Sequence, residues 1–441
     1  MIPPHTQVDG RLKPVYSVRM RVLLIGNGGR EHALAWKLSA SPRVTALYCL
    51  PGNPGTALVA ENVPGSVMDF DRICQFVREK NIELVIIGPE DPLAGGLTDR
   101  IREMKVRCFG PSKDAAQIEA DKWFAKELMR HQAVPTAEAR SFTDYGAAEE
   151  YVRVRNTSCV IKAAGLAKGK GVTICYRTSD ALATIDAMMK QKTFGTAGER
   201  IVIEEMLQGP ECSVLAFVDR KSIYLMETAQ DHKPVDDGDT GPMTGGMGAY
   251  SPTPVVTDAM MRQIERDVFV PVLDGLMRDG IEYTGVLYAG IMITSAGPKV
   301  LEFNCRFGDP ETQPLMMRLQ SDLCEIMVAV CDGKLDSLEL QWDRRPAVCV
   351  VATSPGYPGE YRKGIPITGM EKADAMADVK VFHSGTAMKD GKLVTNGGRV
   401  LAVTALGPDI REAQKRAYRA MELIHFDGMH YRKDIGHQAL K

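Results

Sequence analysis

The chain has 441 residues, of which 44% are hydrophobic, and a formal net charge of -2. This length predicts about three domains with hydrophobic cores, and the near-neutral charge excludes the broad basic surface of a nucleic-acid-binding protein. No apolar run is long enough to span a membrane, and ten scattered cysteines, without a C-x-x-C pair or zinc spacing, predict a reducing, cytoplasmic location.

Residues 1–19 are poorly patterned and lack the apolar segment of a signal peptide, so we expect a disordered N-terminal extension. From residue 20 to 121, apolar strands alternate with helices, and each strand ends at a Gly or Pro turn. This pattern is typical of a buried parallel sheet, here a Rossmann-like α/β domain, whose ligands bind beyond the carboxyl ends of the strands. The predicted strands are 21–26, 44–49, 83–88 and 106–110, and the first helix is 30–40.

Residues 122–342 predict a second unit with α+β character. Within it, about residues 135–209 form a small unit in which two strands are joined by a Gly- and Lys-rich loop. The segment 231–252 is expected to be a long loop without secondary structure, and such loops are usually functional. The predicted elements are a helix at 121–132, strands at 159–163, 171–176 and 200–207, helices at 179–191 and 257–279, and strands at 288–294 and 299–304.

A C-terminal α+β domain is predicted from 343 to 441. It begins with the apolar strand in PAVCVVAT and ends with a helix at 411–424. Between them, Asn396-Gly397-Gly398 is a hairpin signal, because these residue types favour the tight turn that joins antiparallel strands.

The Gly-rich turn IGNGGREHA at 25–33 leads from the first strand into a helix and predicts a phosphate-binding turn. The dinucleotide fingerprint G-x-G-x-x-G fails, because Glu31 occupies the last glycine position and the second strand ends without an acid for a ribose. We therefore predict that the amides of Gly28 and Gly29, with Arg30 nearby, bind phosphate. A turn that needs glycine only for its shape is the alternative.

The segment VIKAAGLAKGKGVTI at 160–174 has a loop rich in glycine and lysine between two strands. This composition predicts a flexible flap whose amides and ammonium groups bind a polyphosphate. It is not a Walker A loop, because three residues separate Gly165 from Gly169 and Gly171 stands where Ser or Thr is required. A solvated hairpin tip is the alternative. Lys162 lies in the strand between apolar neighbours and needs a buried anionic partner.

Acidic side chains on two predicted strands are further candidates. Glu204 and Glu205 end one strand and Glu211 follows it, with a solvated strand edge as the alternative. In VLEFN, Glu302 and Asn304 share one face of a strand and offer the oxygen ligands that Mg²⁺ prefers, unless they occupy the wet face of an edge strand.

Two candidates lie in loops. Arg306 follows the VLEFN strand and could neutralise charge on a transferred phosphoryl group. In the segment 231–252, the residue types exclude an EF-hand calcium site, and the backbone amides of Gly245 and Gly246 are the better candidates to bind substrate.

Five motifs, in this order, resemble the phosphoribosylamine–glycine ligase family of ATP-grasp enzymes. The resemblance runs from Met20 to near the C-terminus, and the motifs at 231–252 and 301–313 are specific to this family rather than to ATP-grasp proteins in general. The motifs are GNGGREHALAWKL, IKAAGLAKGKGV, IEEML, DHK with DTGPMTGGMGAYSP, and LEFNCRFGDPETQ.

The resemblance implies an N-terminal domain, an ATP-grasp core with a small lid subdomain, and a C-terminal domain. It also implies ATP, together with Mg²⁺ or Mn²⁺ held by Glu302 and Asn304. Many ATP-grasp relatives have a further acid where this chain has Ala289 and Gly290, so the number of metals is left open. The implied ATP-binding residues are Lys122, Lys162, Gly165, Lys168, Gly169, Lys170, Gly171, Glu204, Glu205, Met206, Leu207 and Glu211.

The implied reaction joins glycine to 5-phosphoribosylamine through glycyl phosphate, a step of purine biosynthesis, in a monomer without nucleic-acid or membrane partners. Arg306 and Asp309 are the implied catalytic residues, although Asp309 could instead only shape its turn. Alternatives are another ATP-grasp ligase or carboxylase, an NAD oxidoreductase and a non-catalytic nucleotide-binding module. The predicted substrate-binding residues are Gly28, Gly29, Arg30, Gly52, Asn53, Asp231, Gly245 and Gly246, and the first five are chosen from turn chemistry and position at strand ends.

Overall fold

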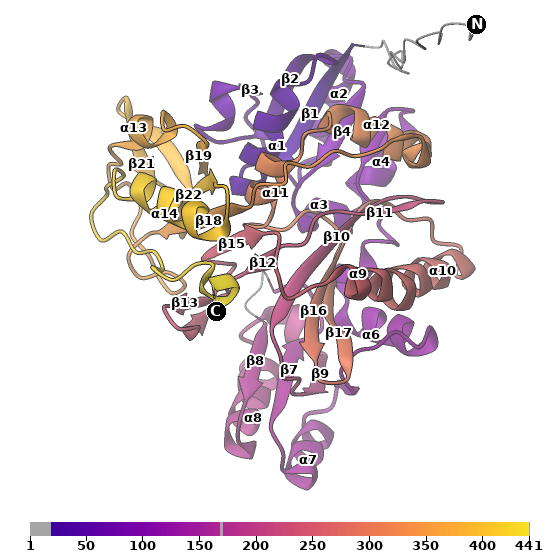
Figure 1. Ribbon diagram of the computed structural model, residues 1–441. Helices are drawn as coiled ribbons and strands as arrows, with labels where there is room; N and C mark the ends of the chain where they lie inside the picture. The colour runs from indigo at the N-terminus through magenta and orange to yellow at the C-terminus, as the bar shows by residue number, and fades with distance from the viewer. Residues whose placement is uncertain (1–18, 168–170, 441) are drawn as a thin grey trace, which may run out of the picture.

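The computed structural model describes residues 19–167 and 171–440, which form four sheets of four or five strands (Figure 1). In Figure 1 the N-terminal sheet lies at the top, the lid at the bottom and the C-terminal sheet at the left, and the central sheet runs between the first two. This mixture of a parallel α/β part with antiparallel α+β parts confirms the predicted fold class.

The N-terminal sheet is parallel throughout, with the strand order β3-β2-β1-β4-β5. The four predicted strands are confirmed, and β3 is an additional short strand. The strand order reverses at β1, so the carboxyl ends of β1 and β4 border the crevice where such sheets bind ligands. The elements are β1 (Met20–Gly26), α1 (Gly29–Ser39), β2 (Val44–Pro51), β3 (Glu61–Asn62), α2 (Phe70–Glu79), β4 (Leu84–Ile87), α3 (Glu90–Ala94), α4 (Leu97–Glu103) and β5 (Arg107–Phe109).

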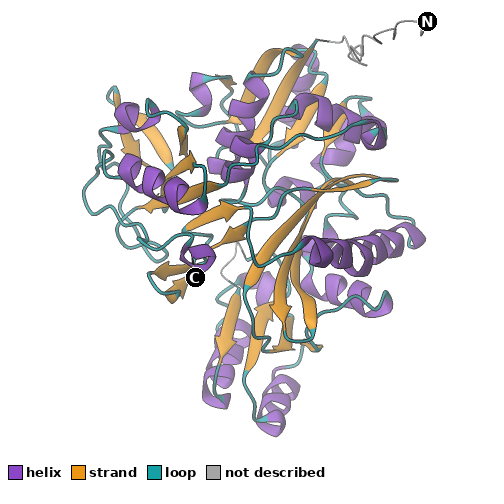
Figure 2. Cartoon of the chain, in the orientation of Figure 1, coloured by secondary structure: helices purple, strands orange, loops and turns teal. Residues whose placement is uncertain are grey.

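Helices cover both faces of the N-terminal sheet (Figure 2), because its strands are apolar on both sides. Leu23 and Ile25 of β1 face one core and Val22 and Leu24 face the other, and all four are fully buried. The first core continues into the central sheet, where it includes Val214. The N-terminal and central sheets therefore share one core, which fixes the crevice against the central sheet.

The lid is an antiparallel sheet of order β6-β9-β7-β8 with a small hydrophobic core of its own. The predicted strand pair on either side of the Gly- and Lys-rich loop is confirmed as β7 and β8. Lys168, Gly169 and Lys170 of the predicted flap lie outside the described residues. The elements from the end of the N-terminal domain through the lid are α5 (Gln117–Ala120), α6 (Lys122–His131), β6 (Ala139–Phe142), α7 (Tyr145–Arg155), β7 (Cys159–Ala163), β8 (Val172–Cys175), α8 (Thr178–Ile185), which continues as a π-helix (Asp186–Lys190), and β9 (Ile201–Glu205).

The central sheet is antiparallel, with the order β11-β10-β16-β17. Its strand β17 carries Glu302 and Asn304, and its predicted strands and helices are confirmed. The elements are β10 (Glu211–Asp219), β11 (Ile223–Leu225), α9 (Asp258–Ile264), a π-helical stretch (Glu265–Phe269), α10 (Val270–Arg278), β16 (Thr284–Thr294), β17 (Gly297–Asn304), α11 (Thr312–Arg318) and α12 (Leu323–Asp332).

The segment 231–252 differs from its prediction as a loop without secondary structure. Four short strands lie in it, the first of which begins one residue earlier. Strand β15 pairs with β18 and β12 pairs with β15, so these two strands extend the C-terminal sheet. Strands this short in a Gly-rich, polar segment show no alternating pattern, and β15 also depends on pairing with the distant strand β18. The strands are β12 (Gln230–Asp231), β13 (Pro234–Asp236), β14 (Thr240–Met243) and β15 (Gly248–Ser251).

The hairpin predicted at Asn396-Gly397-Gly398 is wrong. Strand β21 pairs with β20 across the turn at Asp390-Gly391, whereas β22 pairs with β18 and β19. Gly397 instead allows a close backbone crossing, since a Cβ atom there would lie 2.8 Å from the Cα of Gly385. The elements of this domain are β18 (Ala347–Thr353), α13 (Met370–Asp374), β19 (Val379–His383), β20 (Thr386–Lys389), β21 (Lys392–Thr395), β22 (Arg399–Leu406) and α14 (Ile410–Met421).

The segment after α14 binds the β13–β14 hairpin through ion pairs and a hydrogen bond. Arg432 is fully buried and forms ion pairs with Asp239 at 2.9 Å and with Asp434 at 2.8 Å. The amide of Gly238 donates to Asp434 at 2.8 Å. The end of the chain thus holds the segment that follows the DHK motif.

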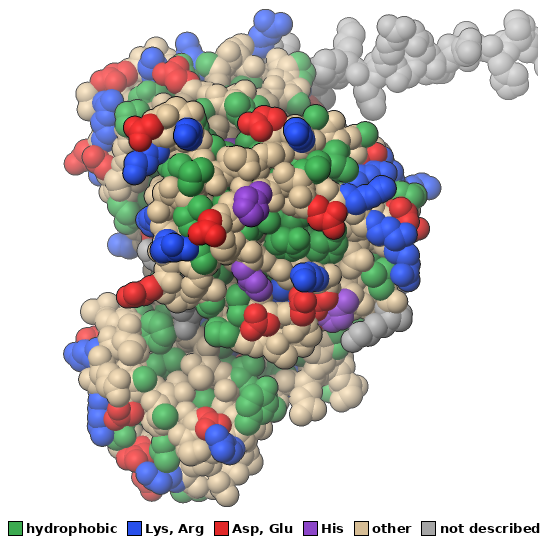
Figure 3. Space-filling view, turned by 90° about the vertical axis from the view of Figure 1, so that its left-hand side faces the viewer, with side chains coloured by type: hydrophobic (Ala, Val, Ile, Leu, Met, Phe, Trp, Pro, Cys, Tyr) green, Lys and Arg blue, Asp and Glu red, His purple; other side chains and the backbone are tan. Residues whose placement is uncertain are grey.

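Figure 3 views the molecule from the side of the C-terminal domain. Acidic and basic side chains are intermingled on this face rather than gathered into a patch of one sign. Among the described residues, no helix has the length and apolar character to cross a membrane.

Candidate active site

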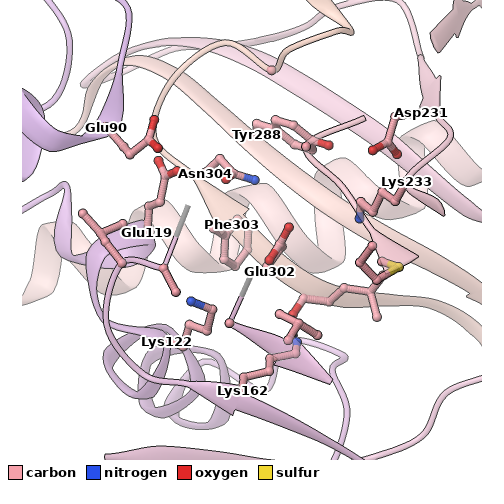
Figure 4. A pocket seen from close by; sticks show the side chains of 18 of the residues that line it. Glu90, Glu119, Lys122, Lys162, Asp231, Lys233, Tyr288, Glu302, Phe303 and Asn304 are labelled. Atoms are coloured by element: carbon pink, nitrogen blue, oxygen red, sulfur yellow. The ribbon is translucent and has the colours of Figure 1, made fainter. Parts of the chain in front are cut away.

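A cavity of about 550 Å³ lies where the N-terminal crevice, the lid and the central sheet meet (Figure 4). Its wall is built from the turns after β1 and β4, from β7 and β8 of the lid, from β17 and from the segment 231–252. The predicted site residues that line it are Gly28, Arg30, Lys122, Lys162, Gly171, Glu204, Glu205, Met206, Leu207, Glu211, Asp231, Gly245, Glu302, Asn304, Arg306 and Asp309.

Glu204 binds two lysines in the wall of this cavity. Its carboxylate lies 3.0 Å from Lys162 Nζ and 3.3 Å from Lys126 Nζ, and the three side chains are at most 6% exposed. Lys162 therefore has the buried anionic partner that the sequence required. Burial lowers the pKa of Lys126 to about 8, although the charge of Glu204 opposes this effect. Lys126 was not predicted, and its spacing of one helical turn from Lys122 on α6 is the signal that could have found it.

Glu302 and Asn304 project from β17 toward the same space, where Lys122 and Lys162 approach Glu302 from one side and Lys233 from another (Figure 4). Burial raises the pKa of Glu302, but the three lysines outweigh this effect and hold the pKa below its usual value. Glu302 is therefore ionised at neutral pH. An ionised carboxylate beside an amide oxygen fits a hard cation such as Mg²⁺.

No group of three or more His, Cys, Asp or Glu side chains in residues 19–167 and 171–440 is arranged to hold a metal. A cation at Glu302 and Asn304 would take its remaining ligands from phosphate oxygens and water, which is the usual arrangement for Mg²⁺ at a nucleotide site. The donor set thus fits a metal that arrives with a nucleotide.

Arg306 connects three segments around Asn304. Its guanidinium group lies 2.7 Å from Glu119 and 3.3 Å from Glu90, and it donates a hydrogen bond to Asn304 Oδ1 at 3.1 Å. In this arrangement Arg306 orients the Asn304 amide, and its predicted action on a phosphoryl group stays a prediction. Glu90 and Glu119 were not predicted, because both belong to the N-terminal part of the chain and only the fold brings them to β17.

An acid-rich group surrounds Lys233. Lys233 Nζ lies 2.8 Å from Glu211, and the Tyr288 hydroxyl donates to Glu311 at 2.6 Å. Burial, against the opposing charge of Lys233, raises the pKa of Asp231 to about 7. Lys233, Tyr288 and Glu311 were not predicted as site residues, although Lys233 lies in the DHK motif and Glu311 in the DPETQ motif.

Arg399 of β22 brings the C-terminal sheet to the cavity. It donates to the carbonyl oxygens of Gly245 at 2.8 Å and Asp309 at 2.6 Å, and it forms an ion pair with the Asp309 carboxylate at 3.2 Å. Gln313 donates to the same carboxylate at 2.8 Å. Asp309 therefore shapes the junction of three segments in addition to lining the cavity.

The phosphate-binding turn at Gly28 and Gly29 stays a prediction, and the structure shows other partners for two of its groups. The amide of Gly28 donates to the Glu31 carboxylate at 2.6 Å, and Arg30 Nη1 donates to the carbonyl oxygen of Phe307 at 3.0 Å. The carboxylate caps the start of α1 and takes the Gly28 amide, which is one of the predicted phosphate donors. The sequence already contained this capping acid at the position that breaks the dinucleotide fingerprint.

Asn53, which was predicted to bind substrate, uses its side-chain amide in hydrogen bonds within the protein. Its Nδ2 atom donates to the carbonyl oxygens of Asn27 at 2.9 Å and His383 at 3.0 Å, and its Oδ1 atom accepts from the amides of Gly55 at 2.8 Å and Thr56 at 3.0 Å. Every hydrogen-bonding position of the amide is thus used within the protein. The predicted site residues that are described but do not line the cavity are Gly29, Gly52, Asn53, Gly165 and Gly246.

Family models of phosphoribosylglycinamide synthetase match almost the entire described chain. The N domain matches residues 20–119, the ATP-grasp (A) domain matches residues 120–312 and the C domain matches residues 347–438. The chain belongs to the phosphoribosylglycinamide synthetase family. The family predicted from the five motifs is therefore confirmed.

Two relatives match over almost all of their own length. A phosphoribosylamine–glycine ligase of Rhodopirellula baltica is 50% identical over 429 residues, which cover 96% of this chain and 98% of the relative. The crystal structure of a phosphoribosylamine–glycine ligase from Thermotoga maritima aligns with a TM-score of 0.83 and 32% identity, over 94% of this chain and 100% of that chain.

A more distant likeness concerns the fold alone. Biotin carboxylase from Campylobacter jejuni aligns with a TM-score of 0.71 over 94% of both chains, at 14% identity. The ATP-grasp architecture is thus shared with carboxylases, so the fold does not by itself select the acceptor substrate.

Proposed function

We propose that the chain is an ATP-dependent ligase that joins glycine to 5-phosphoribosylamine, giving glycinamide ribonucleotide, ADP and phosphate in purine biosynthesis. The observation that carries this proposal is the family match along the chain. It is supported by a cavity in which an ionised Glu302 and the Asn304 amide face three lysines.

In the first step an oxygen of the glycine carboxylate attacks the γ-phosphorus of ATP, and the bond to the leaving ADP breaks. The product, glycyl phosphate, has the good leaving group that a carboxylate lacks. Lys122 and Lys162 would bind the phosphate oxygens and act by electrostatics and positioning. Mg²⁺ or Mn²⁺, held by Glu302 and Asn304, would neutralise negative charge on the transferred phosphoryl group.

In the second step the amine of 5-phosphoribosylamine attacks the acyl carbon and phosphate leaves. The amine nitrogen loses a proton as the amide forms. Asp231, whose pKa is about 7, lines the cavity and is our candidate to accept that proton. Closure of the lid would exclude water, which otherwise hydrolyses glycyl phosphate.

Other predictions stay part of this proposal. They are the domain limits at 20–121, 122–342 with a lid at about 135–209, and 343–441, the monomeric state and the cytoplasmic location. Strands β12 and β15 lie within the predicted core range but pair into the C-terminal sheet. The predicted domain limits therefore divide the sequence into segments, but they do not coincide with the boundaries between the sheets.

ADP release, measured with each combination of substrates, tests the proposal. We expect ADP only when glycine, 5-phosphoribosylamine, ATP and Mg²⁺ are all present. ADP release that requires bicarbonate instead of glycine would favour an ATP-grasp carboxylase. Failure of the three substrates together with Mg²⁺ to release ADP would overturn the ligase assignment.

A further inference from the structure

Two cysteines lie opposite each other on neighbouring strands of the lid. Cys159 of β7 and Cys175 of β8 are partners in the antiparallel register, so their side chains are neighbours on one face of the lid sheet. Both are free thiols, and their exposed fractions are 7% and 0%. This contact has no role in the reaction proposed above.

The strand register allows a bond between the two sulfurs. The amide of Ala163 donates to the carbonyl oxygen of the opposite residue, Gly171, at 2.8 Å, so this is a hydrogen-bonded pair of the ladder. Such pairs recur every second residue, and Cys159 and Cys175 therefore also form one. The Cα atoms of hydrogen-bonded pairs lie about 5.5 Å apart, which is within the range of a disulfide.

The thiols lie behind the cavity wall rather than in it. Val160 and Ile174, adjacent in sequence to the two cysteines and paired with each other, line the cavity. Successive side chains of a strand point to opposite faces, so Cys159 and Cys175 face the small core of the lid. Cys159 also borders a shallow depression on the outer side of the lid, together with Tyr151.

We propose that Cys159 and Cys175 are a thiol modification site, which a peroxide oxidises to an intramolecular disulfide that weakens ATP binding and that a dithiol reverses. In the first step a thiolate attacks an oxygen of hydrogen peroxide, so that an S–O bond forms, the O–O bond breaks and hydroxide leaves. The second sulfur then attacks the sulfenic acid, the S–S bond forms, the S–O bond breaks and water leaves. Two thiols lose two electrons and two protons, and the peroxide is reduced to two water molecules.

The surroundings favour this chemistry. The neighbouring Cys159 thiol lowers the pKa of Cys175 below its ordinary value, which favours the reactive thiolate. Side chains of hydrogen-bonded pairs are farther apart than those of the alternate pairs, so the new bond draws β7 and β8 together. These strands carry Lys162 and the wall residues Val160 and Ile174, so a change in the spacing of the strands moves side chains that line the cavity proposed to bind ATP.

The test uses the full chain treated with hydrogen peroxide and then with an alkylating agent. Trypsin should release the peptides NTSCVIK and GVTICYR as one species joined by a disulfide. The dissociation constant for ATP, measured by titration calorimetry with Mg²⁺, should rise about fivefold or more and return after dithiothreitol. This binding measurement does not depend on turnover, so it is independent of the proposed ligase reaction.

Two variants serve as controls. Cys175→Ser should bind ATP like the untreated chain and should not respond to peroxide. Cys349→Ser, which removes a buried thiol of the C-terminal sheet, should respond like the native chain. Absence of the joined peptide, or a joined peptide with unchanged ATP affinity, would overturn the proposal.

Discussion

Replacing Glu204 with Gln tests whether the lysines of the cavity wall depend on one buried carboxylate. In the native chain the Glu204 side chain is 2% exposed and lies 3.0 Å from Lys162 Nζ and 3.3 Å from Lys126 Nζ. Gln keeps the shape but not the charge, so two buried ammonium groups lose their counter-ion. Breaking a buried ion pair costs about 3–5 kcal/mol. Because Gln still accepts a hydrogen bond, we expect a loss of about 3 kcal/mol in the free energy of unfolding.

The same substitution changes the pH dependence of stability. The folded-state pKa of Lys126, about 8, lies below the ordinary lysine value of 10.5. Between these two values the unfolded chain binds more protons than the folded chain, so stability rises with pH. Without the charge of Glu204 the folded-state pKa of Lys126 falls further. The increase in stability with pH should therefore begin at a lower pH in the Glu204→Gln variant than in the native chain.

Urea unfolding at pH 7 and pH 9 measures both effects, and Glu205→Gln is the matched control. Glu205 is the next residue of β9 and pairs with Lys299 at 3.0 Å, but its side chain is 35% exposed. Loss of such a pair should cost less than about 1 kcal/mol. Equal losses for the two variants would refute the reasoning, because burial would then not decide the cost.

Three further predictions follow from other contacts. Asn304→Ala should lower kcat about 10²- to 10³-fold and raise the Mg²⁺ concentration needed for half-maximal activity. Asn304→Asp keeps an oxygen ligand and should lose less activity. Steady-state kinetics with a Mg²⁺ titration checks both variants. Arg432→Met should lower the free energy of unfolding by about 3–5 kcal/mol, since it removes the buried cation that Asp239 and Asp434 share. Arg362→Met, at an exposed pair, should leave the urea midpoint unchanged. Burial raises the pKa of Asp231 to about 7. The contribution of Asp231 to stability is therefore present at low pH and is lost as pH rises from about 4 to 7. Asp231→Asn should remove this loss, and urea midpoints at pH 5 and pH 8 would show it.

Local patterns predicted the elements that carry the chemistry. The alternation in VLEFN assigned Glu302 and Asn304 to one strand face, and both line the cavity. The need for an anion beside Lys162 follows from the cost of burying a charge, and Glu204 meets it. Such inferences succeed because the signal lies within a few residues of the chain.

The remaining features depend on contacts between distant segments. Glu90 and Glu119 reach Arg306 only through the fold, and β15 pairs with β18, which lies about 100 residues later in the chain. Asn53 has the residue type of a ligand-binding turn, but its partners include the distant carbonyl of His383. A sequence pattern cannot separate these roles, because the same side chain serves a turn, a domain junction or a substrate equally well.

The central claim is that glycine is activated by transfer of a phosphoryl group to its carboxylate. Glycine labelled with ¹⁸O in the carboxylate tests this claim, because the attacking oxygen ends in the released phosphate. Mass spectrometry of the phosphate after turnover with ATP, Mg²⁺ and 5-phosphoribosylamine should show one labelled oxygen for each glycinamide ribonucleotide formed. Product formation with unlabelled phosphate would contradict the account.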